Sequence, residues 1–189
     1  EPLREGAAER VLSAGWARAA SLIALAFAAF QMFLAMPWMP HLPDLTLRSI
    51  HLAFAFTLCF MLLPARGRRG SSRPSIPDFI LIAAAISAFG YIVANYDWIM
   101  RNPASSTPVA VALGSIVILV TLEACRRSIG TVFLLLVSTA ILYAWFGAAI
   151  PGKWGHIGFN WESIVESLYL SSFGLLGHIT GVSADVIAM

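Results

Sequence analysis

The sequence predicts an all-α integral membrane protein with five transmembrane helices, a short periplasmic interfacial amphipathic helix, and a truncated sixth membrane helix. Hydrophobic residues make up 59% of the chain and charged residues 12%, against about 45–50% and about 25% in soluble domains. The mean hydropathy is +0.79. A core of this size could not bury so much apolar surface. The net charge of +2 and the lack of a recurring basic face exclude intrinsic disorder and nucleic-acid binding.

The apolar runs have the length of membrane helices, because a helix needs about 20 residues to cross the hydrocarbon core. Residues 116–120 are continuously apolar, whereas a membrane-spanning β-strand would alternate. Five segments qualify: Trp16–Met36, Ser49–Leu63, Asp78–Asn95, Pro108–Ala124 and Ile129–Gly147.

The residues between these segments are typical of helix ends. Pro37 and Pro40 end the first helix, because proline cannot continue it. Ser75 and Asp78 have the spacing of a capping box before the third helix. Thr107 supplies a cap residue before the fourth. The first apolar region is too long for a signal peptide, and no small-residue cleavage site follows it.

Basic residues predict the orientation, because Lys and Arg concentrate in cytoplasmic loops. With a cytoplasmic N-terminus, nine of the twelve basic residues lie inside and three lie outside; the opposite orientation inverts this ratio. The inside set is Arg4, Arg10, Arg18, Arg66, Arg68, Arg69, Arg73, Arg126 and Arg127, and the outside set is Arg48, Arg101 and Lys153.

The last 42 residues differ from the preceding spans. Residues 148–158 hold one proline and three glycines. The ten residues 161–170 are predicted to form a helix too short to span, capped by Asn160, whose apolar face carries Trp161, Ile164, Val165 and Leu168. We expect this helix to lie flat at the outer interface. Leu175–Met189 would extend only about 22 Å of the roughly 30 Å needed, so the chain is expected to be a fragment, or one whose remainder lies on another chain.

Small residues predict which helix faces meet, because lipid provides no hydrophobic drive for association. Three stripes stand out: Ser21, Ala24 and Ala28 in the first helix, Ala83, Ser87 and Gly90 with Ala84 and Ala88 in the third, and Ala110 with Gly114 in the fourth.

Ionisable residues at membrane depth are functional candidates. Glu123 precedes Arg126 and Arg127 by three and four residues, the spacing of side chains that meet on a helix. A local ion pair at a helix end explains this spacing, and a role in transport or gating is the alternative. Asp185 would lie well inside the hydrocarbon. It faces a protein or water-filled interior, or its segment is not a simple span.

Other polar residues have simpler interpretations. His51 lies about one turn into the second helix and is expected to form an interfacial hydrogen bond; a haem anchor would need a second histidine at matching depth. Asp97 marks an aromatic-belt boundary or an exposed partner site. Cys59 and Cys125 are not placed for a disulfide. No hydrolase, metalloprotease, phosphate-loop or dinucleotide motif is present. We expect no enzyme activity, no catalytic or metal site and no bound cofactor.

Four segments in order resemble one family. Residues 48–54, 95–97, 122–130 and 169–184 together resemble the N-terminal part of the fused permeases of TRAP transporters (tripartite ATP-independent periplasmic transporters), particularly those paired with TAXI-type binding proteins. The resemblance implies that residues 1–127 form a four-helix module like the small (Q-type) subunit. Residues 128–189 would begin the large (M-type) permease subunit.

The resemblance also implies a function. The full transporter would use a sodium or proton gradient to take up organic anions (carboxylates) delivered by a periplasmic TAXI-type solute-binding protein. Substrate-binding residues are expected downstream of Met189, so this segment would be mainly scaffold in a bacterial inner membrane. Its partners would be that binding protein, the remainder of the large subunit and membrane lipids. Asp185 matches no acidic position of the family. The alternatives are a non-transporting anchor or assembly subunit and a haem-binding redox subunit based on His51.

Overall fold

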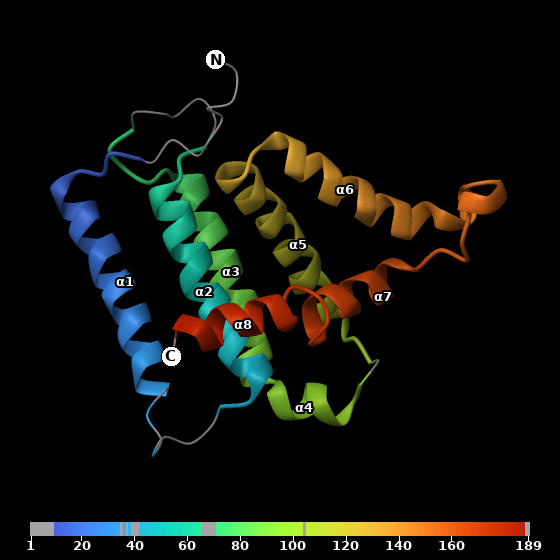
Figure 1. The fold of residues 1–189 in the computed structure, drawn as a ribbon, viewed down its shortest axis with the longest axis horizontal. Coiled ribbons are helices and arrows are strands. Elements are labelled where there is room, and N and C mark those ends of the chain that lie inside the picture. Colours follow the sequence, from blue (N-terminus) through green and yellow to red (C-terminus); the bar gives the residue numbers. More distant parts are fainter. Residues whose placement is uncertain are drawn as a thin grey trace.

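The computed structural model describes residues 10–34, 36, 38, 42–65, 71–103 and 105–187, with side chains to residue 184. Within these residues the fold is all-helical and holds five helices long and apolar enough to cross a membrane (Figure 1). Four of them are α1 (Ala14–Leu34), α2 (Asp44–Leu62), α3 (Ile76–Ala94) and α5 (Pro108–Ser128). The fifth is α6 (Thr131–Phe146) together with the 3₁₀ turn η1 (Gly147–Ala149). The five predicted spans are confirmed as helices, and the main shift is the start of α2 at Asp44 rather than Ser49.

The predicted helix caps are confirmed. The Asp78 carboxylate accepts hydrogen bonds from the backbone N–H and the hydroxyl of Ser75, at 2.7 and 2.8 Å. The Thr107 hydroxyl accepts from the backbone N–H of Ala110 at 3.1 Å. The Asn160 side chain accepts from the N–H of Ser163 at 2.9 Å. These bonds satisfy N–H groups that a helix cannot pair internally.

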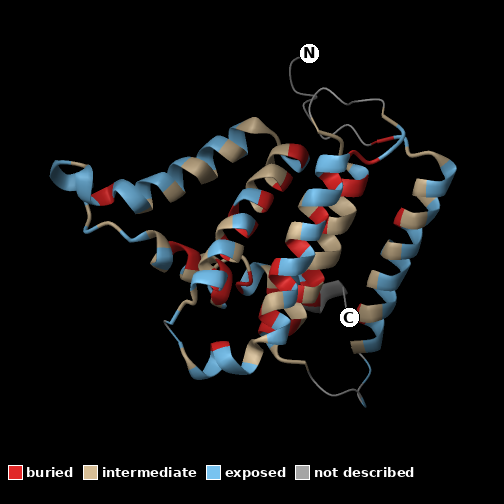
Figure 2. Cartoon of the chain, turned by 180° about the vertical axis from the view of Figure 1, so that it is seen from behind, coloured by how far each residue is buried: buried red, intermediate tan, exposed pale blue. Residues whose placement is uncertain are grey.

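The core lies between α2, α3 and α5. Figure 2 shows buried residues concentrated on these helices and on the segment that follows residue 160. Phe56 stacks on Phe60 and on Phe89, with ring centroids 6.2 and 5.8 Å apart. Ala110 and Gly114 are buried as predicted. On α3, however, the inward face carries Ala85 and Ala88 beside larger residues, and the predicted stripe of Ala83, Ser87 and Gly90 is exposed.

Helix α1 packs on α2 with few buried residues. Ala20 and Gln31 are the buried positions of α1, and Phe27 stacks on Phe54 with ring centroids 5.1 Å apart. The predicted face of Ser21, Ala24 and Ala28 is exposed. The buried face of α1 therefore carries Ala20 and Gln31, and the predicted small-residue face is not the one that packs inward.

The short amphipathic helix is confirmed as an element, but it packs into the bundle. It comprises α7 (Trp161–Val165) and a π-helical turn, η3 (Glu166–Leu170). The Tyr169 hydroxyl donates to the carbonyl of Ala88 at 2.5 Å, and the Trp161 indole donates to the Ser115 hydroxyl at 2.8 Å. Ser115 lies seven residues into α5, which is about 10 Å along that helix. The α7–η3 segment therefore packs between the helices rather than lying flat across their ends as the sequence had predicted.

The π turn changes which residues face inward. An α-helical stripe predicts Leu168 on the buried face, whereas the structure buries Tyr169 and Leu170 and leaves Leu168 half-buried. A π turn closes i→i+5 hydrogen bonds and so rotates the following side chains. Burial raises the pKa of the Tyr169 phenol, so that Tyr169 remains a neutral hydrogen-bond donor.

Helix α6 leans away from α5 as it leaves their common turn (Figure 1). No residue of α6 is buried. The segment after α6 folds back on it: His156 lies within 3.1 Å of the Tyr143 carbonyl, and the Tyr143 hydroxyl donates to the Trp154 carbonyl at 2.7 Å. Large apolar side chains of α6 are therefore open to the surroundings, among them Val132, Leu135 and Leu136.

The expected sixth membrane helix is α8 (His178–Ile187), which begins three residues later than predicted. It packs against α2 and α1. Arg48 of α2 donates to the carbonyl of Leu176 at 3.0 Å, just before α8 begins. The ten described residues of α8 are about half of those that a helix needs to cross a bilayer.

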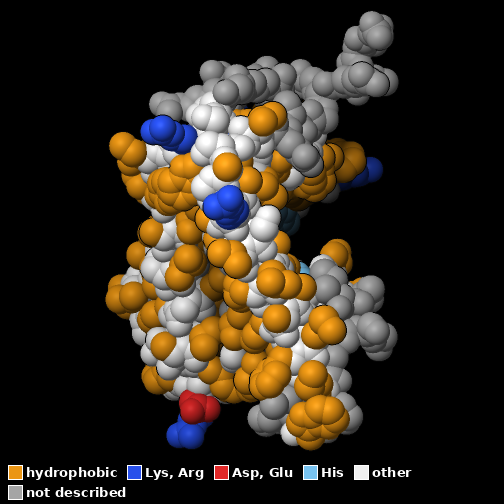
Figure 3. Space-filling model, turned by 90° about the vertical axis from the view of Figure 1, so that its left-hand side faces the viewer, with side chains coloured by type: hydrophobic (Ala, Val, Ile, Leu, Met, Phe, Trp, Pro, Cys, Tyr) orange, Lys and Arg blue, Asp and Glu red, His pale blue; other side chains and the backbone are white. Residues whose placement is uncertain are grey.

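The exterior has the polarity expected of a membrane protein. Figure 3 shows hydrophobic side chains spread over one face of the molecule, with Lys and Arg side chains near its upper end and an acidic and a basic side chain at its lower end. The end where α1 and α3 begin and α2 and α5 end is called the arginine-rich end below. Its described basic residues are Arg10, Arg18, Arg73, Arg126 and Arg127.

Gly114 lies at a close contact between α5 and the α7–η3 segment. A Cβ there would lie 2.7 Å from Cδ1 of Tyr169 and would also clash with Val165. We expect Gly114→Ala to lower the melting temperature in detergent, because overpacking costs about 1–3 kcal/mol. Gly90→Ala is the matched control, since no atom lies within 4 Å of its added Cβ. Equal melting temperatures for the two variants would contradict this packing.

Candidate functional site

A cluster of five charged side chains lies at the arginine-rich end, and Asp78 is at its centre. Its Oδ2 accepts from Nη2 of Arg10 at 2.8 Å, and its Oδ1 accepts from Nη1 of Arg127 at 2.7 Å. The side chains of all three residues are at most 2% exposed. With the two bonds from Ser75, the carboxylate accepts four hydrogen bonds. The sequence analysis recognised Asp78 only as a capping residue and missed both arginine partners.

Arg127 joins three helices. Besides Asp78 of α3, it donates through Nε to Glu123 of α5 at 2.7 Å and through Nη1 to the carbonyl of Leu63, which follows α2, at 3.0 Å. Its guanidinium carbon lies 5.0 Å from the ring centroid of Phe60, within cation–π range. Arg127 therefore neutralises two carboxylates and one helix end at once.

The predicted pairing of Glu123 with Arg126 and Arg127 is confirmed. Arg126 binds both carboxylate oxygens of Glu123, through Nε and Nη2, each at 2.7 Å. Glu123 and Arg126 are each 24% exposed, so they form the outer part of the cluster. The alternative role in transport or gating stays a prediction.

Arg10 reaches the cluster from the segment before α1. Its backbone N–H donates to the carbonyl of Leu62 at 2.8 Å, and its Nη1 donates to the carbonyl of Met61 at 3.4 Å. The N–H of Ser13 donates to the carbonyl of Ser72. These bonds pair carbonyls at the end of α2, which a helix leaves unpaired. The segment before α1 is thereby fixed to the ends of α2 and α3.

A second polar contact lies toward the opposite ends of α1 and α2. Nε2 of Gln31 and Nδ1 of His51 are 2.7 Å apart, and Nε2 of His51 lies 3.4 Å from the Ser183 hydroxyl of α8. Gln31 and His51 are both buried. The prediction that His51 forms a hydrogen bond is confirmed, but His51 lies seven residues into α2 rather than one turn, because α2 starts earlier. Gln31 was not identified from the sequence.

The remaining candidates are placed as follows. Asp97 is exposed in the first turn of α4 (Tyr96–Arg101), and both of its interpretations stay predictions. Asp185 belongs to the α8 backbone, but its side chain lies outside the described residues. His41 also lies outside them. Among the described residues, no group of three or more His, Cys, Asp or Glu side chains could hold a metal ion.

The cluster makes Asp78 the most sensitive charged residue that the structure describes. Removing one partner of a buried ion pair costs about 3–5 kcal/mol, because the remaining charge is left uncompensated. We expect Asp78→Asn to lower the free energy of unfolding by this amount, measured by unfolding in a mixed detergent. Asp44→Asn is the control, because the Asp44 side chain is 77% exposed and its pair with Arg48 should contribute at most about 1 kcal/mol. Similar losses in both variants would contradict a buried cluster.

Comparison with known proteins finds no match: no family model, no curated protein and no solved structure is similar to this chain.

Proposed function

We propose that this chain is a membrane permease component of a TRAP-type secondary transporter that takes up organic anions with an ion gradient. The observation that carries the proposal is the order of the four resembling segments along the chain. The five helices long enough to cross a membrane are consistent with it. The carboxylate substrates, the periplasmic TAXI-type binding protein and the sodium or proton gradient all follow from this resemblance.

Within such a transporter, the described helices would serve mainly as scaffold. Asp78, Glu123 and Arg127 are paired with one another or with neighbouring groups, so their charges are already compensated. The cluster fixes the ends of α2, α3 and α5 relative to one another. Such a fixed frame suits the static part of a transporter, and substrate chemistry would take place in another part of the transporter.

The proposed location is the bacterial inner membrane, with several passes and a cytoplasmic N-terminus. The arginine-rich end would face the cytoplasm, because Lys and Arg concentrate on that side. Arg48 and Arg101 lie in α2 and α4 at the opposite ends of the helices.

Cysteine labelling in intact cells tests this orientation. Ser72 and Ser105 are exposed and lie before α3 and before α5, at opposite ends of the bundle. In a background with Cys59 and Cys125 replaced by serine, we expect a membrane-impermeant maleimide to label Ser105→Cys and not Ser72→Cys. Permeabilised cells should label both. Labelling of Ser72→Cys alone in intact cells would contradict the proposed orientation and indicate the opposite one.

Uptake of radiolabelled carboxylates tests the function. We expect deletion of residues 1–127 at the chromosomal locus to abolish sodium- or proton-driven uptake that the intact locus supports. The anchor alternative predicts intact uptake with a disturbed complex. In proteoliposomes, the 189-residue chain by itself should show no uptake, and robust ion-driven transport by it would contradict a scaffold role. A Soret band in the purified protein would favour the haem alternative.

A further inference from the structure

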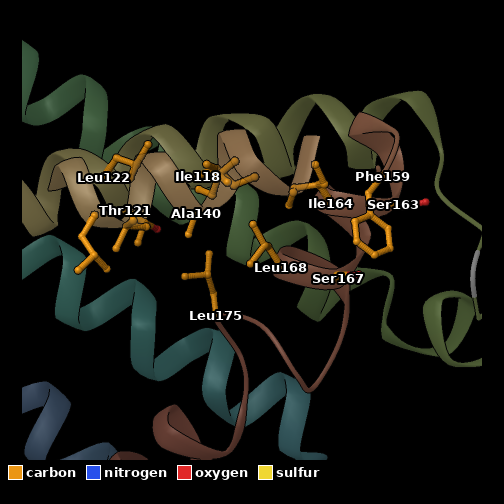
Figure 4. Close-up of a pocket in the computed structure, with 14 residues that line it drawn as sticks. Ile118, Thr121, Leu122, Ala140, Phe159, Ser163, Ile164, Ser167, Leu168 and Leu175 are labelled. Carbon is orange, nitrogen blue, oxygen red and sulfur yellow. The ribbon is translucent and has the colours of Figure 1, made fainter. Parts of the chain in front are cut away.

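We propose that the groove between α5, α6 and α7 binds one anionic phospholipid, with its phosphate at Arg126 and an acyl chain in the groove. The groove has a volume of about 450 Å³. Figure 4 shows residues that line it: Ile118 and Leu122 of α5, Ala140 of α6, and Ile164 and Leu168 of the α7–η3 segment. The inference goes beyond the transport proposal and requires only that the helices lie in a bilayer.

The lining favours hydrocarbon. It is almost entirely aliphatic and aromatic, and its few polar groups are hydroxyls such as those of Thr121 and Ser167. The Thr121 hydroxyl already donates to the carbonyl of Val117 at 2.8 Å. A polar ligand would find few free partners here, whereas an acyl chain needs none.

The length of the groove favours one acyl chain of a single leaflet. Its lining on α6 runs from Leu136 to Ala144, which is eight residues or about 12 Å of helix. One leaflet is about half of the roughly 30 Å hydrocarbon core. Arg126 lies one helical turn beyond Leu122, the last residue of α5 that lines the groove.

Charge complementarity identifies the head group. The cluster holds three arginines and two carboxylates, so it carries one uncompensated positive charge. Arg10, Asp78 and Arg127 are buried, and Glu123 with Arg126 forms the exposed part. Arg126 lies one helical turn from Leu122 on the same face of α5. Its Nε and Nη2 bind Glu123, which leaves Nη1 for a phosphate oxygen. Basic pockets between membrane helices bind anionic head groups in this way.

Native mass spectrometry of the purified chain tests the site with phosphatidylglycerol and phosphatidylcholine of identical acyl chains. We expect one phosphatidylglycerol per chain, bound at least fivefold more tightly than phosphatidylcholine, because one arginine near the surface contributes about a fivefold preference. Arg126→Gln should remove this preference. Arg18→Gln is the control, since Arg18 is an exposed arginine on α1 away from the groove.

Filling the groove tests the acyl-chain part. Ala140→Phe should weaken binding of both lipids about tenfold, whereas Thr139→Phe, on an exposed position of α6 that does not line the groove, should not. If Ala140→Phe fails to fold, Ala144→Phe fills the same groove one turn later. Three lipid-binding results would overturn the proposal: equal binding of the two lipids, unchanged binding in Arg126→Gln, or unchanged binding in the groove-filling variant. A dimer that the groove-filling variant dissociates would also overturn it, because a second chain would then occupy the groove.

Discussion

The fold depends on one buried carboxylate. Asp78 lies at the first turn of α3 and accepts four hydrogen bonds, two of them from arginines that are 117 residues apart in the sequence. A buried charge without partners costs several kcal/mol, and this cost rises in hydrocarbon, where water cannot replace a missing donor. The native fold supplies Arg127 from α5 and Arg10 from the segment before α1, which is bound to the end of α2. Local helix formation and tertiary packing are thus linked through one side chain.

Apolar packing then fills the space that the cluster leaves. Phe56, Phe60 and Phe89 stack between α2 and α3, and the small residues Ala88 and Gly114 admit the α7–η3 segment from the other side. The segment that follows α6 therefore contacts helices of the first 127 residues. If residues 1–127 and 128–189 descend from two subunits, these contacts join them.

The sequence predicted most of the helices, because span length, proline and capping residues are local signals. It also predicted Glu123 with Arg126 and Arg127, since their spacing on one helix brings them together. The pairing of Asp78 with Arg10 could not be predicted in this way, because the two residues are 68 residues apart. The sequence indicated only that both lie at the same end of the membrane helices. The small-residue rule succeeded for Gly114 and failed for Ser21 and Gly90, because aromatic contacts took the place of close backbone approach.

Polar contacts hold helix α1 near both of its ends: the Arg10 bonds before its start, and Gln31 with His51 near its last turn. Polar attraction of this kind grows as the local dielectric constant falls. Excluding water should therefore strengthen the polar contacts of α1, and water that enters from detergent micelles should weaken them. The protein in lipid and the protein in detergent would therefore differ most in the strength of the contacts between α1 and the other helices.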